Sequence, residues 1–149
     1  MSDLGETRPQ TPEHGDGGQA FFTSVGCMDG RVQKPVTEYG QKRYGVLYAD
    51  TITEAGLVGL VSNNPSNELL ESIKKKILIS VEKHHSKGII VHGHQECAGN
   101  PVKDNLHQEE TRKTAEIIRG FVPGVEVKPV FVVKENGNWE VKEVLLSNR

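Results

Sequence analysis

Short apolar runs recur along the chain and predict three strands in its first two thirds. They cover residues 20–26, 44–50 and 89–91, and each is short enough to cross a sheet once. Between the last two runs, a helix is predicted from Asn64 to about His85, because apolar residues recur there three or four positions apart. These residues are Leu69, Leu70, Ile73, Ile77 and Val81. The alternation of strand, helix and strand predicts parallel pairing through a crossover helix.

Residues that favour helix ends refine this prediction. Pro65 suits the first position of the long helix, Asn64 can cap it, and Gly88 can end it. A shorter helix is predicted within residues 51–60, with Thr53 as its N-cap.

The C-terminal third is predicted to hold one helix and two strands. The helix covers residues 104–120 and is capped by its first residue, and the strands cover residues 125–134 and 139–146. Residues 135–138 read Glu-Asn-Gly-Asn, and Asn-Gly suits the type I′ turn of a hairpin. Pro129 lacks a backbone N–H group and therefore predicts an edge strand or a bulge.

The composition limits the class of protein. The 149 residues suffice for a single domain, predicted at 20–149, after a disordered or arm-like tail at 1–19 in which few residues are apolar. The formal net charge is -2, from 18 basic and 20 acidic residues, and no basic face stands out, so no nucleic-acid partner is predicted. No apolar run reaches membrane length and no signal-peptide pattern is present, which predicts no membrane association and a cytoplasmic location.

Residues with metal-binding chemistry follow two of the predicted strands. The run at 89–91 leads into His92 and His94, and Cys97 stands three positions after His94. His94 and Cys97 place an imidazole and a thiolate within reach of one metal ion, but zinc prefers four ligands. The only other cysteine, Cys27, also follows a predicted strand, and in a reducing compartment metal or catalytic use is favoured over a disulfide. The simplest interpretation brings the two loops together around one zinc ion.

Cys27, Asp29 and Arg31 follow one another at a period of two residues. If the extended conformation of the preceding strand persists, all three side chains point to one side. Taken singly, a buried cysteine is usually a small core residue, and an aspartate beside an arginine is usually an ion pair of little energetic value. The combination favours function, because both cysteines follow predicted strands and a histidine stands at ligand spacing.

The motif Cys27-x-Asp29-x-Arg31, followed by a strand, a helix, a strand and then His94-x-x-Cys97, resembles the β-class carbonic anhydrase family. The resemblance implies an α/β fold with a mixed, mostly parallel β-sheet flanked by helices, to which the chain adds its C-terminal β-hairpin. It implies that Cys27, His94 and Cys97 bind Zn²⁺. It also implies that Asp29 and Arg31 form a catalytic dyad.

The reaction implied by the resemblance is the reversible hydration of carbon dioxide to bicarbonate and a proton, which is a lyase activity. A zinc-bound hydroxide, oriented by the dyad, attacks carbon dioxide. The resemblance also implies a homodimer or higher homo-oligomer, and a second state in which the aspartate itself binds zinc. His92, His107, His84 and His85 are candidate proton carriers, although structural roles are favoured for all of them.

The chain also departs from the family pattern. The segment after Cys97 is short, Ala98 stands where the family usually has glycine, and residues 49–56 differ from an asparagine- and glycine-rich stretch. One alternative is a hydrolase of carbonyl sulfide or carbon disulfide on the same fold, and another is a non-catalytic zinc-binding module. A third is a thiol redox protein that pairs the two cysteines, although the chain lacks the usual Cys-x-x-Cys arrangement.

Overall fold

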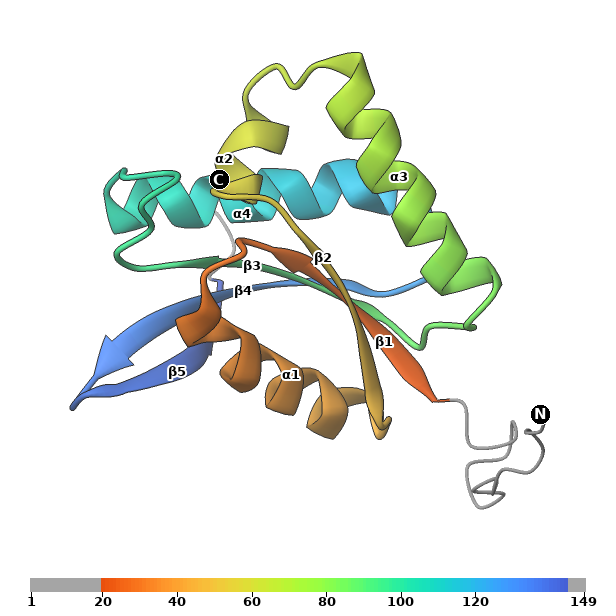
Figure 1. Ribbon diagram of the computed structural model, residues 1–149, viewed down its shortest axis with the longest axis horizontal. Coiled ribbons are helices and arrows are strands. Elements are labelled where there is room, and N and C mark those ends of the chain that lie inside the picture. The colour runs from red at the N-terminus through yellow and green to blue at the C-terminus, as the bar shows by residue number, and fades with distance from the viewer. Residues whose placement is uncertain (1–19, 145–149) are drawn as a thin grey trace, which may run out of the picture.

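The computed structural model describes residues 20–144, which form one five-stranded sheet with helices on both faces (Figure 1). In chain order the elements are β1 (Phe21–Gly26), α1 (Gly30–Tyr44), β2 (Tyr48–Thr53), α2 (Leu57–Ser62), α3 (Asn67–Glu82), β3 (Ile89–His94), α4 (Asp104–Arg119), β4 (Val127–Glu135) and β5 (Asn138–Glu143). The strand order is β2-β1-β3-β4-β5, with parallel pairing throughout except between β4 and β5. The predicted α/β class, with its mixed, mostly parallel sheet and C-terminal hairpin, is confirmed. The tail predicted at 1–19 lies outside the described residues.

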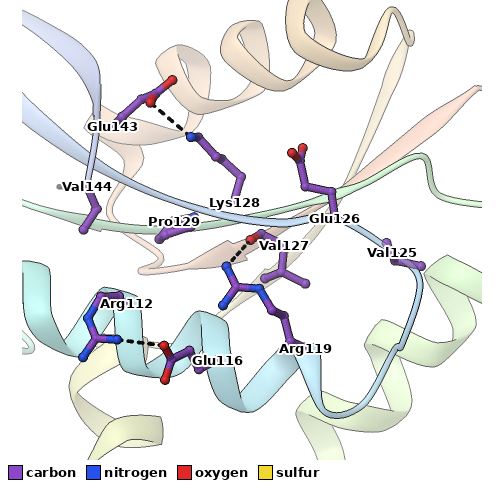
Figure 2. A pocket seen from close by; sticks show the side chains of 10 residues that line it. All are labelled: Arg112, Glu116, Arg119, Val125, Glu126, Val127, Lys128, Pro129, Glu143 and Val144. Atoms are coloured by element: carbon purple, nitrogen blue, oxygen red, sulfur yellow. Dashed lines mark hydrogen bonds and ion pairs between the residues drawn. The ribbon is translucent and has the colours of Figure 1, made fainter. Parts of the chain in front are cut away.

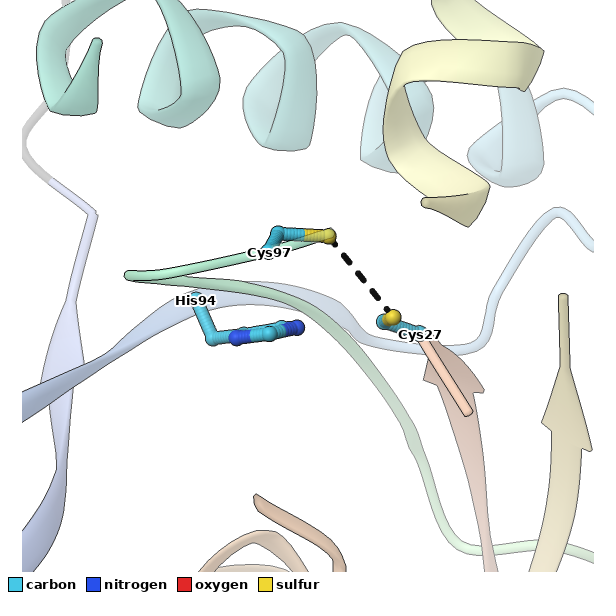
Figure 3. Close-up of side chains that lie close together, drawn as sticks. All are labelled: Cys27, His94 and Cys97. Carbon is cyan, nitrogen blue, oxygen red and sulfur yellow. Dashed lines mark hydrogen bonds between the residues drawn. The ribbon is translucent and has the colours of Figure 1, made fainter. Parts of the chain in front are cut away.

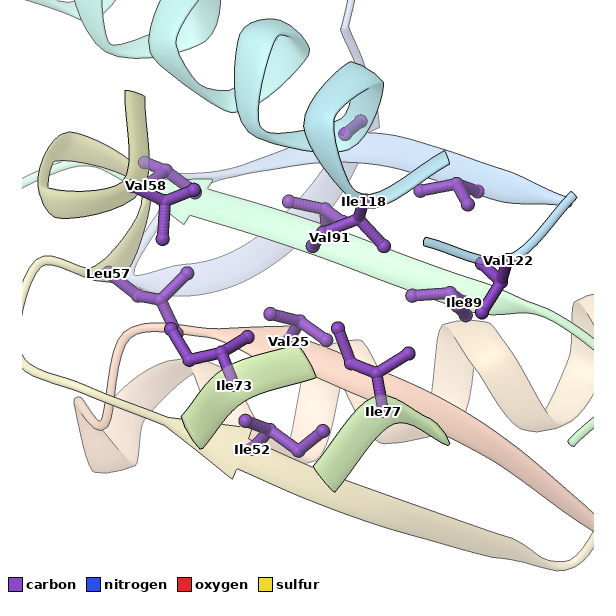
Figure 4. Close-up of a cluster of buried hydrophobic side chains, with 13 residues drawn as sticks. Val25, Ile52, Leu57, Val58, Ile73, Ile77, Ile89, Val91, Ile118 and Val122 are labelled. Carbon is purple, nitrogen blue, oxygen red and sulfur yellow. The ribbon is translucent and has the colours of Figure 1, made fainter. Parts of the chain in front are cut away.

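Three helices cover one face of the sheet. Val25 of β1 and Val91 of β3 pack there against Ile73 and Ile77 of α3 and Ile118 of α4 (Figure 4). Strand β3 is buried along its whole length, as expected for a central parallel strand that helices cover on both faces. Within the described residues, no helix combines the length and the apolar character that a membrane span requires.

Helix α1 covers the opposite face and corrects the predicted extended run from Cys27 to Arg31. The Asp29 side chain accepts a hydrogen bond from the Arg31 backbone N–H at 2.9 Å, so Asp29 caps the helix and Arg31 lies in its first turn. Val32 and Val36 are buried against this face of the sheet. Two apolar residues are too few to reveal a helix by their spacing alone, which is why the sequence did not predict α1.

Two helices begin later than the sequence predicted, because other residues occupy their N-cap positions. Ser66, rather than Asn64, caps α3 by accepting a hydrogen bond from the backbone N–H of Leu69 at 3.1 Å. Gly56, rather than Thr53, precedes α2 and has a φ of 65°, in the left-handed region that favours glycine.

The C-terminal hairpin agrees with its prediction, and the position of its proline agrees in part. Asn136 and Gly137 have φ values of 53° and 81°, and a type I′ turn requires positive φ at both central residues. Pro129 precedes the part of β4 that pairs with β5, which begins at Val130, so it has a paired strand on one side only, as an edge position does, and it forms no bulge. Strand β4 lies between β3 and β5, and its register with β3 continues without interruption through the pair Val91 and Pro129.

Candidate metal centre

The parallel sheet brings the three predicted ligand residues together at the carboxyl ends of two neighbouring strands, β1 and β3. Cys27 directly follows β1, His94 is the last residue of β3, and Cys97 lies in the loop after β3. Because β1 and β3 are parallel neighbours, their carboxyl ends lie side by side. The Sγ atoms of Cys27 and Cys97 are 3.7 Å apart, and the potential ligand atoms of all three residues lie within 4.8 Å of one another (Figure 3). We call these three buried residues the metal centre.

The His94 ring is oriented so that one nitrogen faces the two thiols. Its Nδ1 lies 2.6 Å from the backbone oxygen of Gln95, and this nitrogen must donate because a carbonyl oxygen only accepts. In the neutral ring, Nε2 then carries a lone pair. Nε2 is fully buried and has no hydrogen-bond partner among residues 20–144. Buried polar atoms are almost always paired, so this nitrogen, with two thiols beside it, is suited to bind a metal ion.

The two thiols fit a tetrahedral metal ion. Thiolates that bind one zinc ion at about 2.3 Å stand about 3.8 Å apart at the tetrahedral angle, close to the 3.7 Å observed between Cys27 and Cys97. The backbone N–H of Gly56 donates to Cys27 Sγ at 3.4 Å, as is common for a metal-binding thiolate. Both cysteines are free, so no disulfide joins them.

The pKa values of the two cysteines are shifted in opposite directions. Burial opposes ionisation of Cys27, but the nearby His94 side chain and the backbone N–H groups of Gly56 and Asp29 lower its pKa overall. Burial and then the negative charge of Cys27 raise the pKa of Cys97. A divalent metal supplies the charge that stabilises the second thiolate.

Asp29 and Arg31 form a close pair beside the metal centre. Arg31 Nε donates to Asp29 Oδ1 at 3.0 Å, and Nη2 donates to Oδ2 at 2.7 Å. These hydrogen bonds are the main reason that the pKa of Asp29 is lowered to about 2, so the carboxylate is ionised at neutral pH. Asp29 Oδ2 lies 4.0 Å from His94 Nε2, which places the carboxylate next to the potential ligands.

Sequence reasoning missed the residues that hold the loop after β3. Asn100 Nδ2 donates at 2.7 Å to the buried carboxylate of Glu110 on α4, whose other oxygen accepts from Asn63 at 3.0 Å. Gly56 packs against the same loop so closely that a Cβ there would lie 2.4 Å from the backbone oxygen of Gly99. No local pattern signals these contacts, because they join segments far apart in the sequence.

The candidate proton carriers occupy different environments. His92 is fully buried, both of its ring nitrogens lack a partner within the described residues, and burial lowers its pKa to about 3. It therefore has no contact with solvent through which to pass a proton to buffer. His107 is buried against Phe131. His84 pairs with Asp50 at 2.6 Å.

A cavity of about 650 Å³ lies elsewhere, between α4 and β4 (Figure 2). Its charged groups already have partners. Arg112 pairs with Glu116 at 2.8 Å, and Arg119 donates to the backbone oxygen of Val127 at 2.9 Å. Because no unpaired reactive group lines it among the described residues, the metal centre remains the candidate functional site.

Comparisons with known proteins address the family and the fold. A family model described as "Putative carbonic anhydrase" matches residues 17–145. The crystal structure of the β-carbonic anhydrase CafA of the fungal pathogen Aspergillus fumigatus matches with a TM-score of 0.53 and 12% identity, covering 91% of this chain and 81% of that chain. At this identity the match shows the fold alone. No curated protein matches the chain.

Proposed function

Because this chain belongs to the putative carbonic anhydrase family, we propose that it catalyses the zinc-dependent, reversible hydration of carbon dioxide to bicarbonate and a proton. Cys27, His94 and Cys97 would hold the zinc ion. One observation carries the proposal: the buried Nε2 of His94, which has no hydrogen-bond partner within the described part of the chain, faces two thiols beside an ionised aspartate.

The donor set suits a catalytic ion, because three protein ligands leave a fourth position open. When bound, zinc acts as a Lewis acid that lowers the pKa of a coordinated water to about 7, which is the chemistry that carbon dioxide hydration needs. Asp29 would contribute orientation. An ionised carboxylate only accepts hydrogen bonds, so Asp29 would accept one from the O–H group of the nucleophile and thereby hold it in a fixed orientation toward the substrate.

Arg31 would keep Asp29 in this role. Its two hydrogen bonds to the carboxylate fix the plane of that group, and its charge keeps Asp29 ionised over the whole neutral range. Capping of α1 by the same carboxylate gives a further constraint on its position. Arg31 would therefore position Asp29, and Asp29 would itself contact the nucleophile.

Stopped-flow measurement of carbon dioxide hydration by zinc-assayed protein tests the proposal. We expect activity that increases with pH through about pH 7, where a zinc-bound water ionises. Asp29→Asn is expected to keep stoichiometric zinc and the fold, because asparagine is an equally good helix cap. Its activity should fall by about 100-fold or more, the usual loss when a group that directs proton positions is removed.

Other outcomes separate the alternatives. Zinc-replete protein without hydration activity would contradict the proposal, and assays with carbonyl sulfide and carbon disulfide would then distinguish another hydrolase from a non-catalytic module. Purified protein without zinc, in which Cys27 and Cys97 form a disulfide, would favour the thiol redox hypothesis. Homodimeric assembly and a cytoplasmic location remain predictions.

A further inference from the structure

The guanidinium group of Arg31 is held on three sides, of which Asp29 is only one. Along its outer edge, Nη1 donates to Glu96 Oε1 at 3.0 Å and Nη2 donates to the backbone oxygen of Glu96 at 3.1 Å. Trp139 of β5 covers one face, with its ring centroid 4.8 Å from Arg31 Cζ. Together with the Asp29 contacts, these hydrogen bonds engage four of the five N–H groups of the side chain.

We propose that Glu96 and Trp139 are positioning residues that hold Arg31 against Asp29 and thereby fix the carboxylate beside the metal centre. This inference rests on the proposed function. Glu96 lies between His94 and Cys97 in the sequence, so its contacts with Arg31 connect the loop after β3 to the first turn of α1. Trp139 adds a connection to the C-terminal hairpin.

An ion pair with Asp29 alone would be too weak to fix the position of the Arg31 guanidinium group. The Arg31 side chain is 44% exposed, and an exposed pair typically contributes between about 0 and 1 kcal/mol. A second carboxylate and an aromatic face restrict the planar guanidinium in directions that Asp29 does not control, and such stacking suits arginine in particular. The position of Asp29 then depends on all three contacts.

The backbone of Glu96 supports the same inference. Its φ is 57°, in the left-handed region that residues other than glycine rarely adopt. Both its carbonyl oxygen and its side chain accept hydrogen bonds from Arg31, so this unusual conformation presents two acceptors to one guanidinium. Local strain of this kind is concentrated at functional sites.

Four variants and one control test the proposal in the zinc-loaded full-length protein. Glu96→Ala and Trp139→Leu each remove one contact, while Glu96→Gln keeps an acceptor and Trp139→Phe keeps an aromatic face. Glu116→Ala is the matched control, because Glu116 is also an exposed glutamate that pairs with an arginine, but with Arg112 on α4. Zinc content is measured for every protein.

The first measurement is hydrogen exchange of the Arg31 Nε–H group with water, followed by NMR. This N–H donates to Asp29, so its protection reports on that contact without reference to activity. We expect Glu96→Ala and Trp139→Leu to accelerate exchange by about tenfold, while the two conservative variants recover most of the protection and Glu116→Ala leaves it unchanged. Unchanged exchange in both Glu96→Ala and Trp139→Leu would overturn the proposal.

The second measurement is steady-state hydration kinetics. A positioning role predicts that kcat falls by about tenfold in Glu96→Ala and Trp139→Leu, with KM and zinc content nearly constant, since misplaced groups slow the chemical step. A kcat that stays at the wild-type value, or falls only in proportion to lost zinc, would contradict that role. If the wild-type protein hydrates no carbon dioxide, the proposed function fails, and the exchange measurement still decides whether Glu96 and Trp139 hold Arg31.

Discussion

Helix α1 carries an arginine–carboxylate pair at each end, and the two pairs are built alike. At its start, Arg31 Nε and Nη2 donate to the two oxygens of Asp29 at 3.0 and 2.7 Å. At its end, Arg43 Nε and Nη2 donate to the two oxygens of Glu126 at 2.9 and 2.7 Å. In each case the arginine hydrogen bonds are the main reason that the carboxyl pKa is lowered to about 2.

The surroundings of the two pairs differ. Glu126 precedes β4 at the opposite end of the sheet and also accepts a hydrogen bond from Tyr44 at 2.8 Å, so its neighbours are polar groups that already have partners. Asp29 Oδ2 lies 4.0 Å from His94 Nε2, a buried nitrogen without a partner among the described residues. A lowered carboxyl pKa therefore marks a well-paired group at both ends, and only the end near His94 also carries the ligand atoms of the proposed site.

Cys97→Ser is expected to have the largest effect, because it removes one of the three potential metal ligands, which lie near only one end of α1. We expect zinc to be lost, hydration activity to fall to background, and the free energy of unfolding in the presence of zinc to decrease by about 3 kcal/mol or more. Metal analysis and urea unfolding with and without a chelator measure these changes. With chelator, wild-type and variant stabilities should converge, and a variant that kept stoichiometric zinc would show that Cys97 is not a ligand.

Asn100→Ala is expected to have an intermediate effect at the same end of the sheet. It leaves the buried Glu110 with one hydrogen-bond donor fewer, which should lower the free energy of unfolding by about 1–3 kcal/mol. It also frees the loop that carries Cys97, so zinc affinity should fall by about 10-fold or more, as measured by chelator competition.

Asn63→Ala is the matched control, because it removes the other donor to Glu110 from the end of α2. It should lower stability by a similar amount and leave zinc affinity unchanged. Equal losses of affinity in both variants would show that Glu110, rather than the loop after β3, determines metal binding.

The sequence was sufficient to find the potential ligands because each stands next to a strand that its own apolar residues reveal. Cys27 follows β1 and His94 ends β3, so the parallel order of the sheet alone predicts that they meet. Helix α1 was missed because its third buried position is Gly40, which packs on Phe22 so closely that a Cβ would lie 2.1 Å from the ring. A glycine in this role contributes nothing to an apolar pattern.

The contacts around the dyad could not be predicted from the sequence. Glu96 and Trp139 reach Arg31 from different strands, and only the tertiary arrangement brings them together. Glu96 offered a weak signal as a charged residue between two ligands, whereas Trp139 read only as part of a hairpin strand. Resemblance to a family pointed to Asp29 and Arg31, and the structure was needed to show which residues contact Arg31.

Glu126→Gln is expected to have the smallest effect on stability. The pH dependence of that effect tests whether the Arg43–Glu126 pair, unlike the Arg31–Asp29 pair, contributes to stability alone. The folded-state pKa of Glu126, about 2, lies below its ordinary value of 4.5, so the ionised form is the one that folding stabilises. The contribution is therefore fully present above about pH 4.5 and is lost as the pH falls toward 2. It should amount to at most about 1 kcal/mol, because 46% of the side chain is exposed and solvent screens the pair.

Urea unfolding of wild-type and Glu126→Gln protein in steps from neutral to acidic pH measures this contribution directly. The stability difference should be constant near neutral pH and shrink as Glu126 becomes protonated, while zinc content and hydration activity remain those of the wild type. A difference that persists unchanged into acid would mean that the charge of Glu126 contributes nothing. A loss of hydration activity in Glu126→Gln would show that the pair at the far end of α1 also affects the metal centre. Both arginine–carboxylate pairs would then contribute to activity.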